Sequence, residues 1–216
     1  MSYKSDTSLA ANSKGEIIAN SISHGIGVGL SIAGLVILII RAANRGTSWH
    51  VVSFIIFGVS LLLLYLASTV YHSFATKPWK AILQRLDHAA IYFLIAGTYT
   101  PFLLTKLRTG LGWSILGVIW GISIVGLIIK LGFSTKFEKP TVLLYLLMSW
   151  AGVIVFVQAW NQIGKLSMSL LLIGGAFYTV GVIFYRWKKL PYSHAIWHLF
   201  VLGGSAFHYF SVLQLA

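Results

Sequence analysis

The chain has 216 residues, of which 57% are hydrophobic and only 9% are charged. A soluble globular domain carries roughly 25% charged residues, so this composition excludes a protein with a fully water-compatible surface. No cysteine is present, which excludes disulfides and thiolate metal sites and leaves imidazole and carboxylate groups as metal ligands. The net charge of +12 comes from basic residues between apolar runs, so we expect them to orient the chain in a membrane and not to bind nucleic acid.

Seven apolar runs follow one another along the chain, each close to the roughly 20 residues that a helix needs to cross a bilayer. We therefore predict an all-α integral membrane bundle of seven transmembrane helices over residues 16–216. A short polar tail, residues 1–15, precedes it and lacks the apolar core and cleavage site of a signal peptide. The runs cover residues 18–41, 50–74, 87–105, 111–132, 141–160, 167–187 and 194–214.

The basic residues are distributed unevenly between the two sides of this predicted bundle. With a cytoplasmic N-terminus, 11 lysines and arginines fall in the cytoplasmic segments and 5 in the outer ones. Short cytoplasmic loops are enriched in Lys and Arg. The sequence therefore predicts a cytoplasmic N-terminus and a C-terminus outside.

Polar and ionisable side chains recur where four of the spans reach the predicted cytoplasmic side. Such groups are costly in a bilayer and by default mark a functional site. They are Glu16, Asn20 and His24 on the first span, His72 on the second, Asp87 on the third, and His194 and His198 on the seventh. The first-span group is expected either to shape the mouth of a cavity or to form only a solvated helix start.

The spacing of the histidines predicts a metal site. His194 and His198 are four residues apart, which places both imidazoles on one helix face about 6 Å apart along the axis. With His72 they can fill three corners of a tetrahedron and leave the fourth for water, as in a catalytic zinc site. The general-base position of a His-Glu-x-x-His motif is occupied by Ala195, so the base must come from another helix, and Asp87 is the candidate.

These residues, taken as an ordered set, resemble the hemolysin III family. That family is the bacterial branch of the progestin and adiponectin receptor group, which is related to the alkaline ceramidases. The motifs that carry the resemblance are Glu16-x-x-x-Asn20-x-x-x-His24, Ser68-x-x-x-His72, Leu86-Asp87-His88 and His194-x-x-x-His198.

The resemblance implies a zinc ion held by His72, His194 and His198, with Asp87 and Ser68 around the metal-bound water. In the eukaryotic relatives lipid amide hydrolysis is the favoured activity. The bacterial branch is named for haemolysis and is tied to homeostasis of the membrane, which implies a multi-pass protein of the bacterial plasma membrane. The receptors carry a soluble ligand-binding segment before the bundle, whereas this chain has a short polar tail there.

The leading functional prediction is a zinc-dependent hydrolase of a lipid amide or ester. Asp87 would move the proton of the attacking water, and Ser68 would hydrogen-bond the developing oxyanion or position Asp87. Membrane lipids are the expected partners and nucleic acid is not. Two alternatives remain open: a non-enzymatic membrane sensor with a structural zinc, and a pore-forming cytolysin.

Overall fold

The computed structural model describes residues 13–74, 78–132 and 138–216, so most of the predicted polar tail lies outside it. All regular structure in these ranges is helical. The helices are α1 (Lys14–Arg45), α2 (Ser48–Ser73), α3 (Lys80–Thr105), α4 (Gly110–Gly132), α5 (Glu138–Gln158), α6 (Trp160–Ile163), α7 (Lys165–Arg186) and α8 (Ser193–Leu213).

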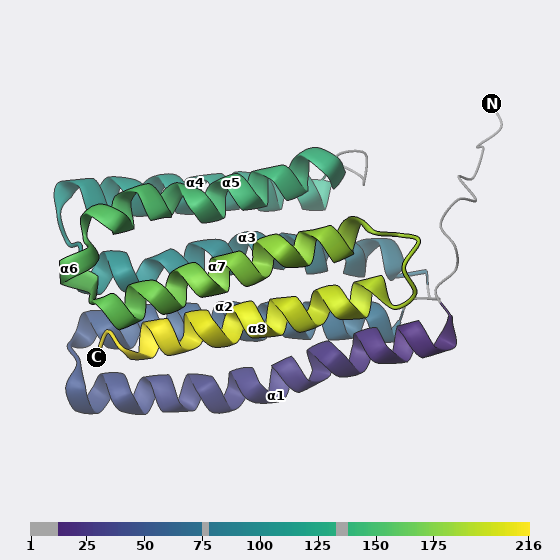
Figure 1. Cartoon of the computed structure of the whole chain (residues 1–216), viewed down its shortest axis with the longest axis horizontal. Coiled ribbons are helices and arrows are strands. Elements are labelled where there is room, and N and C mark those ends of the chain that lie inside the picture. Colours follow the sequence, from purple (N-terminus) through teal and green to yellow (C-terminus); the bar gives the residue numbers. More distant parts are fainter. Residues whose placement is uncertain (1–12, 75–77, 133–137) are drawn as a thin grey trace.

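The long helices lie side by side along one axis (Figure 1). Helix α1 packs against α2 and α8, and α7 packs against α8. Helix α3 is central and contacts α2, α4, α5 and α8. In Figure 1, α1 begins at the right and the chain ends at the left. The end of α2, the start of α3 and the start of α8 therefore lie at the same end of the bundle as the start of α1.

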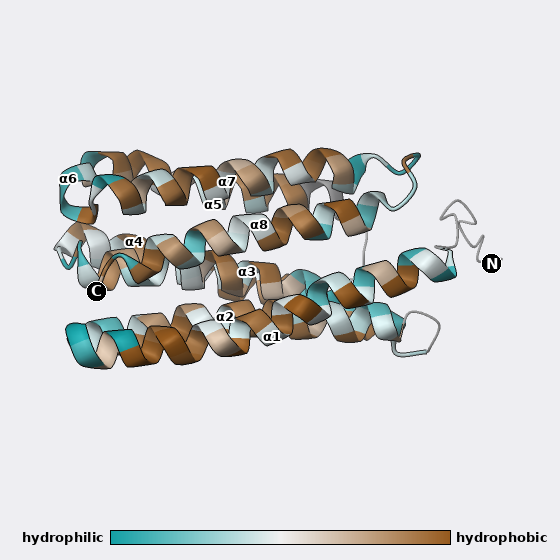
Figure 2. Cartoon of the chain, turned by 60° about the horizontal axis from the view of Figure 1, so that its bottom comes forward, coloured by the Kyte–Doolittle hydropathy of each residue, from teal (hydrophilic) through white to brown (hydrophobic). Residues whose placement is uncertain are grey.

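Six of the described helices are long and apolar enough to cross a membrane: α1, α2, α4, α5, α7 and α8. Large apolar side chains project from their outer faces, and Leu30 and Ile154 are 63% and 72% exposed. Figure 2 shows apolar residues along the length of the helices and polar residues gathered toward the ends. Such an exposed apolar surface is stable against lipid and unstable in water, so the chain is a multi-pass membrane protein.

Helix α3 corresponds to the predicted third span but is not among these six. Its first turns carry Lys80, Arg85, Asp87 and His88, which lower its apolar character. Its second half is buried almost throughout by the surrounding helices. The low hydropathy of α3 is therefore that of a helix surrounded more by protein than by lipid. Helix α3 also begins at Lys80, whereas the predicted apolar run begins at residue 87.

The ends of two other helices also differ from the apolar runs. Helix α1 begins at Lys14, because Ser13 and Glu16 form a reciprocal capping box in which each side chain accepts a hydrogen bond from the other's backbone, at 3.2 and 2.8 Å. The predicted run at 141–160 ends as α5 at Gln158 and is followed by the short α6. Helix α6 stops at Gly164, whose φ of 93° lies in the left-handed region that favours glycine.

Two glycines of α4 provide a matched test of helix packing. A Cβ at Gly126 would lie under 3.0 Å from three ring atoms of Tyr92 on α3, whereas a Cβ at Gly121 would meet nothing within 4 Å. We expect Gly126→Ala to lower the stability of the bundle by about 1–3 kcal/mol through overpacking. Gly121→Ala should leave stability unchanged or raise it by up to about 1 kcal/mol, because alanine favours helix. Thermal unfolding in detergent measures both, and equal midpoints for the two variants would contradict the described α3–α4 packing.

Candidate metal centre

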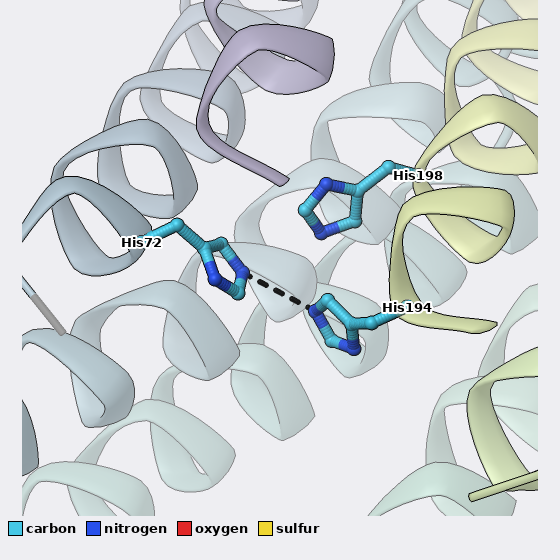
Figure 3. A group of neighbouring side chains, drawn as sticks. All are labelled: His72, His194 and His198. Carbon is cyan, nitrogen blue, oxygen red and sulfur yellow. Dashed lines mark hydrogen bonds between the residues drawn. The ribbon is translucent and has the colours of Figure 1, made fainter. Parts of the chain in front are cut away.

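Three histidines meet at the end of the bundle where α1 begins. His72 lies in the last turn of α2, and His194 and His198 lie in the first two turns of α8. Figure 3 shows the three imidazoles turned toward one another, one from α2 and two from α8. The i, i+4 spacing on α8 places two of the rings on one helix face, and α2 supplies the third from across the interface.

The nitrogen separations fit a zinc ion. One ring nitrogen from each of the three histidines lies within 4.8 Å of the others. The Nε2 atoms of His72 and His194 are 3.2 Å apart. Tetrahedral zinc with Zn–N bonds of 2.0–2.1 Å separates two nitrogen ligands by roughly 3.3 Å. The group can therefore hold a metal ion with little movement of the side chains.

Hydrogen bonds between its ring and α1 fix the orientation of the His198 side chain. Its Nδ1 lies 3.2 Å from the carbonyl oxygen of Asn20 and 2.9 Å from Oγ of Ser23. The Ser23 hydroxyl donates to the same Asn20 carbonyl at 3.0 Å. Nδ1 must then carry the ring proton and donate it, because neither oxygen has a hydrogen left to give to it. Nε2 of His198 is left as a free lone pair, which is the arrangement that metal-binding histidines adopt.

Several buried polar atoms around the three histidines have no hydrogen-bond partner among the described residues. They are Nδ1 and Nε2 of His24, both amide atoms of the Asn20 side chain, and Oγ of Ser68. His24 stacks on His198 with ring centroids 3.5 Å apart. Buried polar groups cost free energy when unpaired. Their concentration here fits a site that holds a metal ion together with water or a polar ligand.

A cavity of about 150 Å³ opens beside the histidines. Its polar end is lined by His24, Ser68, Asp87, His194 and His198, and Asp87 is the only acidic side chain among the described lining residues. The Ser68 hydroxyl lies near the Asp87 carboxyl. The rest of the wall is mainly apolar and comes mostly from α3, α5, α7 and α8, with Leu64 of α2 and Lys130 of α4. Its apolar residues include Leu94, Ile95, Val153, Phe156 and Leu171.

Glu16 and Asn20, predicted to shape the cavity mouth, are not among the residues that line the cavity. Asn20 acts through its backbone carbonyl on His198. Glu16 accepts a hydrogen bond at 3.0 Å from the backbone N–H of Tyr192, just before α8. Tyr192 has a φ of 56° and is the only non-glycine residue with positive φ among the described residues. Glu16 thus joins the starts of α1 and α8 and fixes the turn that leads to His194.

Other site residues were not singled out from the sequence. Ser23 contacts His198, and the ring of Tyr65 packs edge-on against His24 with centroids 5.1 Å apart. Serine and tyrosine are common in membrane helices, and no spacing signal marks these two. His208 lies ten residues beyond His198 on the same helix. It is not part of the three-histidine group, but it lines the same cavity.

A family model described as "Haemolysin-III related" matches residues 15–209 of the chain. The chain belongs to the haemolysin-III related family. The match covers α1 to most of α8, so it includes every residue of the three-histidine group and of the cavity's polar end.

Individual relatives of this family align over nearly the whole chain. The "Hemolysin-3 homolog" of Bacillus subtilis is 52% identical over 92% of this chain and 93% of its own length. The "Hemolysin-3" of Bacillus cereus is 51% identical over 92% of this chain and 90% of its own length. The human "Monocyte to macrophage differentiation factor" is 29% identical over 91% of this chain and 83% of its own length. The chain is therefore similar over nearly its whole length to bacterial hemolysin-3 proteins and, at lower identity, to a human protein.

Proposed function

We propose that the chain is a zinc-dependent membrane hydrolase that cleaves an amide or ester bond of a membrane lipid. One observation carries the proposal: three imidazoles lie at a spacing suited to zinc, and two of them, those of His194 and His198, line a cavity that Asp87 also lines and that continues between apolar walls. A protein site with three neutral ligands and a nearby carboxylate has the composition of a catalytic zinc site. The apolar walls suit a substrate with a hydrocarbon chain.

In the proposed reaction, the three histidines, Asp87 and Ser68 have different roles. His72, His194 and His198 hold the metal, and a bound zinc ion supplies a Lewis acid that polarises a carbonyl and acidifies water. The Asp87 carboxylate accepts the proton of the attacking water and delivers it to the leaving nitrogen or oxygen. The Ser68 hydroxyl donates a hydrogen bond to the carbonyl oxygen as negative charge develops on it. The apolar walls hold the chain of the lipid so that its carbonyl lies near the histidines.

The proposal includes seven membrane crossings, with α3 as the third. Helix α3 has 26 residues, as many as α2, and lies between α2 and α4 in the bundle. Seven crossings agree with a chain that starts and ends at opposite ends of the bundle (Figure 1). The excess of Lys and Arg on one side supports a cytoplasmic N-terminus and an outer C-terminus. The three histidines then lie near the cytoplasmic face.

Elemental analysis of the purified protein tests the metal. We expect about one zinc ion per chain in the wild type, and loss of zinc in His72→Ala and His194→Ala because two imidazoles bind zinc far more weakly than three. His88→Ala is the matched control: this histidine lines the cavity but is not part of the group. It should keep its zinc. A folded wild type without metal after incubation with zinc would contradict the proposal.

Hydrolysis is tested with Asp87→Asn, which keeps the shape of the side chain and removes the base. We expect it to retain zinc and to lose roughly 10²–10⁴-fold in the rate of fatty-acid release from acylated lipids in vesicles. Ser149→Ala, which changes a cavity residue outside the polar end, should keep the rate.

The other candidate functions give different results in these assays. Zinc bound without any lipid hydrolysis, with variants that fail to fold when a ligand is removed, would favour a sensor with a structural metal. Ion conductance of the purified protein in pure lipid bilayers would favour a cytolysin.

The absence of native cysteine allows the orientation to be tested with single introduced thiols. Asn44 lies at the end of α1 and Lys189 lies between α7 and α8, and both are exposed. In intact cells we expect a membrane-impermeant maleimide to label Asn44→Cys and not Lys189→Cys. Lysed cells should show labelling of both. Labelling of both positions in intact cells would mean an even number of crossings between them, which would remove α3 from the count.

A further inference from the structure

A second group of polar side chains lies deep in the same cavity. His208 is ten residues beyond His198 on α8, which places it about 15 Å further along the helix axis. With Tyr65 on α2, Tyr178 on α7 and Ser205 on α8 it forms what we call the deep polar cluster. Tyr178 and His208 line the cavity. Nothing in the proposed hydrolysis uses these groups.

The members of the deep polar cluster are held close together. The Tyr178 hydroxyl and Oγ of Ser205 are 2.7 Å apart, and the rings of Tyr178 and His208 meet with centroids 5.2 Å apart. The ring of His208 lies against Gly174 on α7, where a Cβ would collide with it. Glycine at that position therefore allows the imidazole to lie between α7 and α8.

The deep polar cluster offers both a hydrogen-bond acceptor and hydrogen-bond donors. Nε2 of His208 donates to the carbonyl oxygen of Leu171 at 3.1 Å, so in the neutral ring Nδ1 carries a lone pair. No partner of Nδ1 occurs among the described residues. The Tyr65 hydroxyl lies near Ser205 and Tyr178. Tyr65 is only 2% exposed, and its hydroxyl also has no partner there.

The chemistry of these groups selects among possible ligands. A hydroxyl group can donate to Nδ1 of His208 and accept from a tyrosine, whereas a carbonyl can only accept. A carboxylate would carry an unpaired charge into the middle of the bundle, which is costly. Most of the other residues that line the cavity are apolar, among them Leu94 and Leu171. The matching ligand is an apolar chain with one hydroxyl group part-way along it.

We propose that the cavity binds lipids whose acyl chain carries a mid-chain hydroxyl, which is recognised by His208 and Tyr178. The separation of about 15 Å along α8 corresponds to roughly a dozen carbons of an extended chain between the carbonyl at the histidines and this hydroxyl. The inference rests on the proposed lipid hydrolysis for the position of the carbonyl. It adds a substrate class to that function.

Binding of three fatty acids, the product class of the proposed reaction, tests the inference without turnover. Stearic acid, 2-hydroxystearic acid and 12-hydroxystearic acid compete with a fluorescent fatty acid for the purified, zinc-loaded protein. We expect 12-hydroxystearic acid to bind roughly three- to tenfold more tightly than stearic acid, the effect of one or two net hydrogen bonds. The 2-hydroxy acid should show no such gain, because its hydroxyl remains beside the carboxylate.

The preference should disappear in Tyr178→Phe, which removes one hydroxyl and keeps the ring. Thr98→Val is the matched control: Thr98 lines the same cavity, but its hydroxyl donates to Leu94 within its own helix at 2.8 Å. It should retain the preference. Ser205→Ala provides a second variant if Tyr178→Phe does not fold.

Equal affinity of the wild type for stearic and 12-hydroxystearic acid would overturn the inference, and so would a preference that survives both Tyr178→Phe and Ser205→Ala. The outcome is separable from that of the hydrolase assay. A hydroxyl preference in a protein that cleaves no lipid supports the deep site and counts against the proposed function. Hydrolysis without a hydroxyl preference supports the function and removes the deep site.

Discussion

Lipid offers no hydrogen bonds, so a polar side chain within the bundle must be satisfied by another part of the protein or by something that the protein binds. This constraint explains the inward face of α8. His194, His198, Ser205 and His208 follow one another at spacings that keep them on one side of α8. This side faces α1, α7 and, through the pair of His194 and His72, α2. The outward face of the same helix carries Leu199 and Phe210, which are 60% and 51% exposed. The α8 residues of the three-histidine group and of the deep polar cluster therefore share one helix face.

Because of the same constraint, the geometry of the three-histidine group depends on the packing of three helices. Helix α8 supplies two imidazoles and α2 supplies the third, while the backbone of α1 fixes the proton on His198. Glu16 joins the start of α1 to the turn before α8 at 3.0 Å. A rotation or shift of any one helix would separate the nitrogens or free the ring of His198. Packing between helices thus controls the geometry on which metal affinity depends.

Sequence patterns predict the helical bundle and the meeting of His72, His194 and His198, because apolar length and i, i+4 spacing are local signals. They are less informative about α3, whose apolar character is reduced by polar residues in its first turns, two of which, Asp87 and His88, line the cavity. The contact between Ser23 and His198, and the packing of Tyr65 on His24, depend on how helices distant in sequence are rotated against each other. No periodicity within one helix carries that information. The cavity and the deep polar cluster belong to the same class of feature.

The position of the histidines along the chain has a consequence for biogenesis. Two of the three belong to α8, which leaves the ribosome after α1 to α7, and the third belongs to α2. A nascent chain that lacks α8 holds a single imidazole of the group, and the Asn20 carbonyl of α1 lacks the hydrogen bond from His198. Under the proposed zinc binding, the full ligand set exists only after α8 has been inserted, and the metal then stabilises the bundle that contains α8 over its precursors. Metal loading would then distinguish bundles that contain α8 from those that lack it.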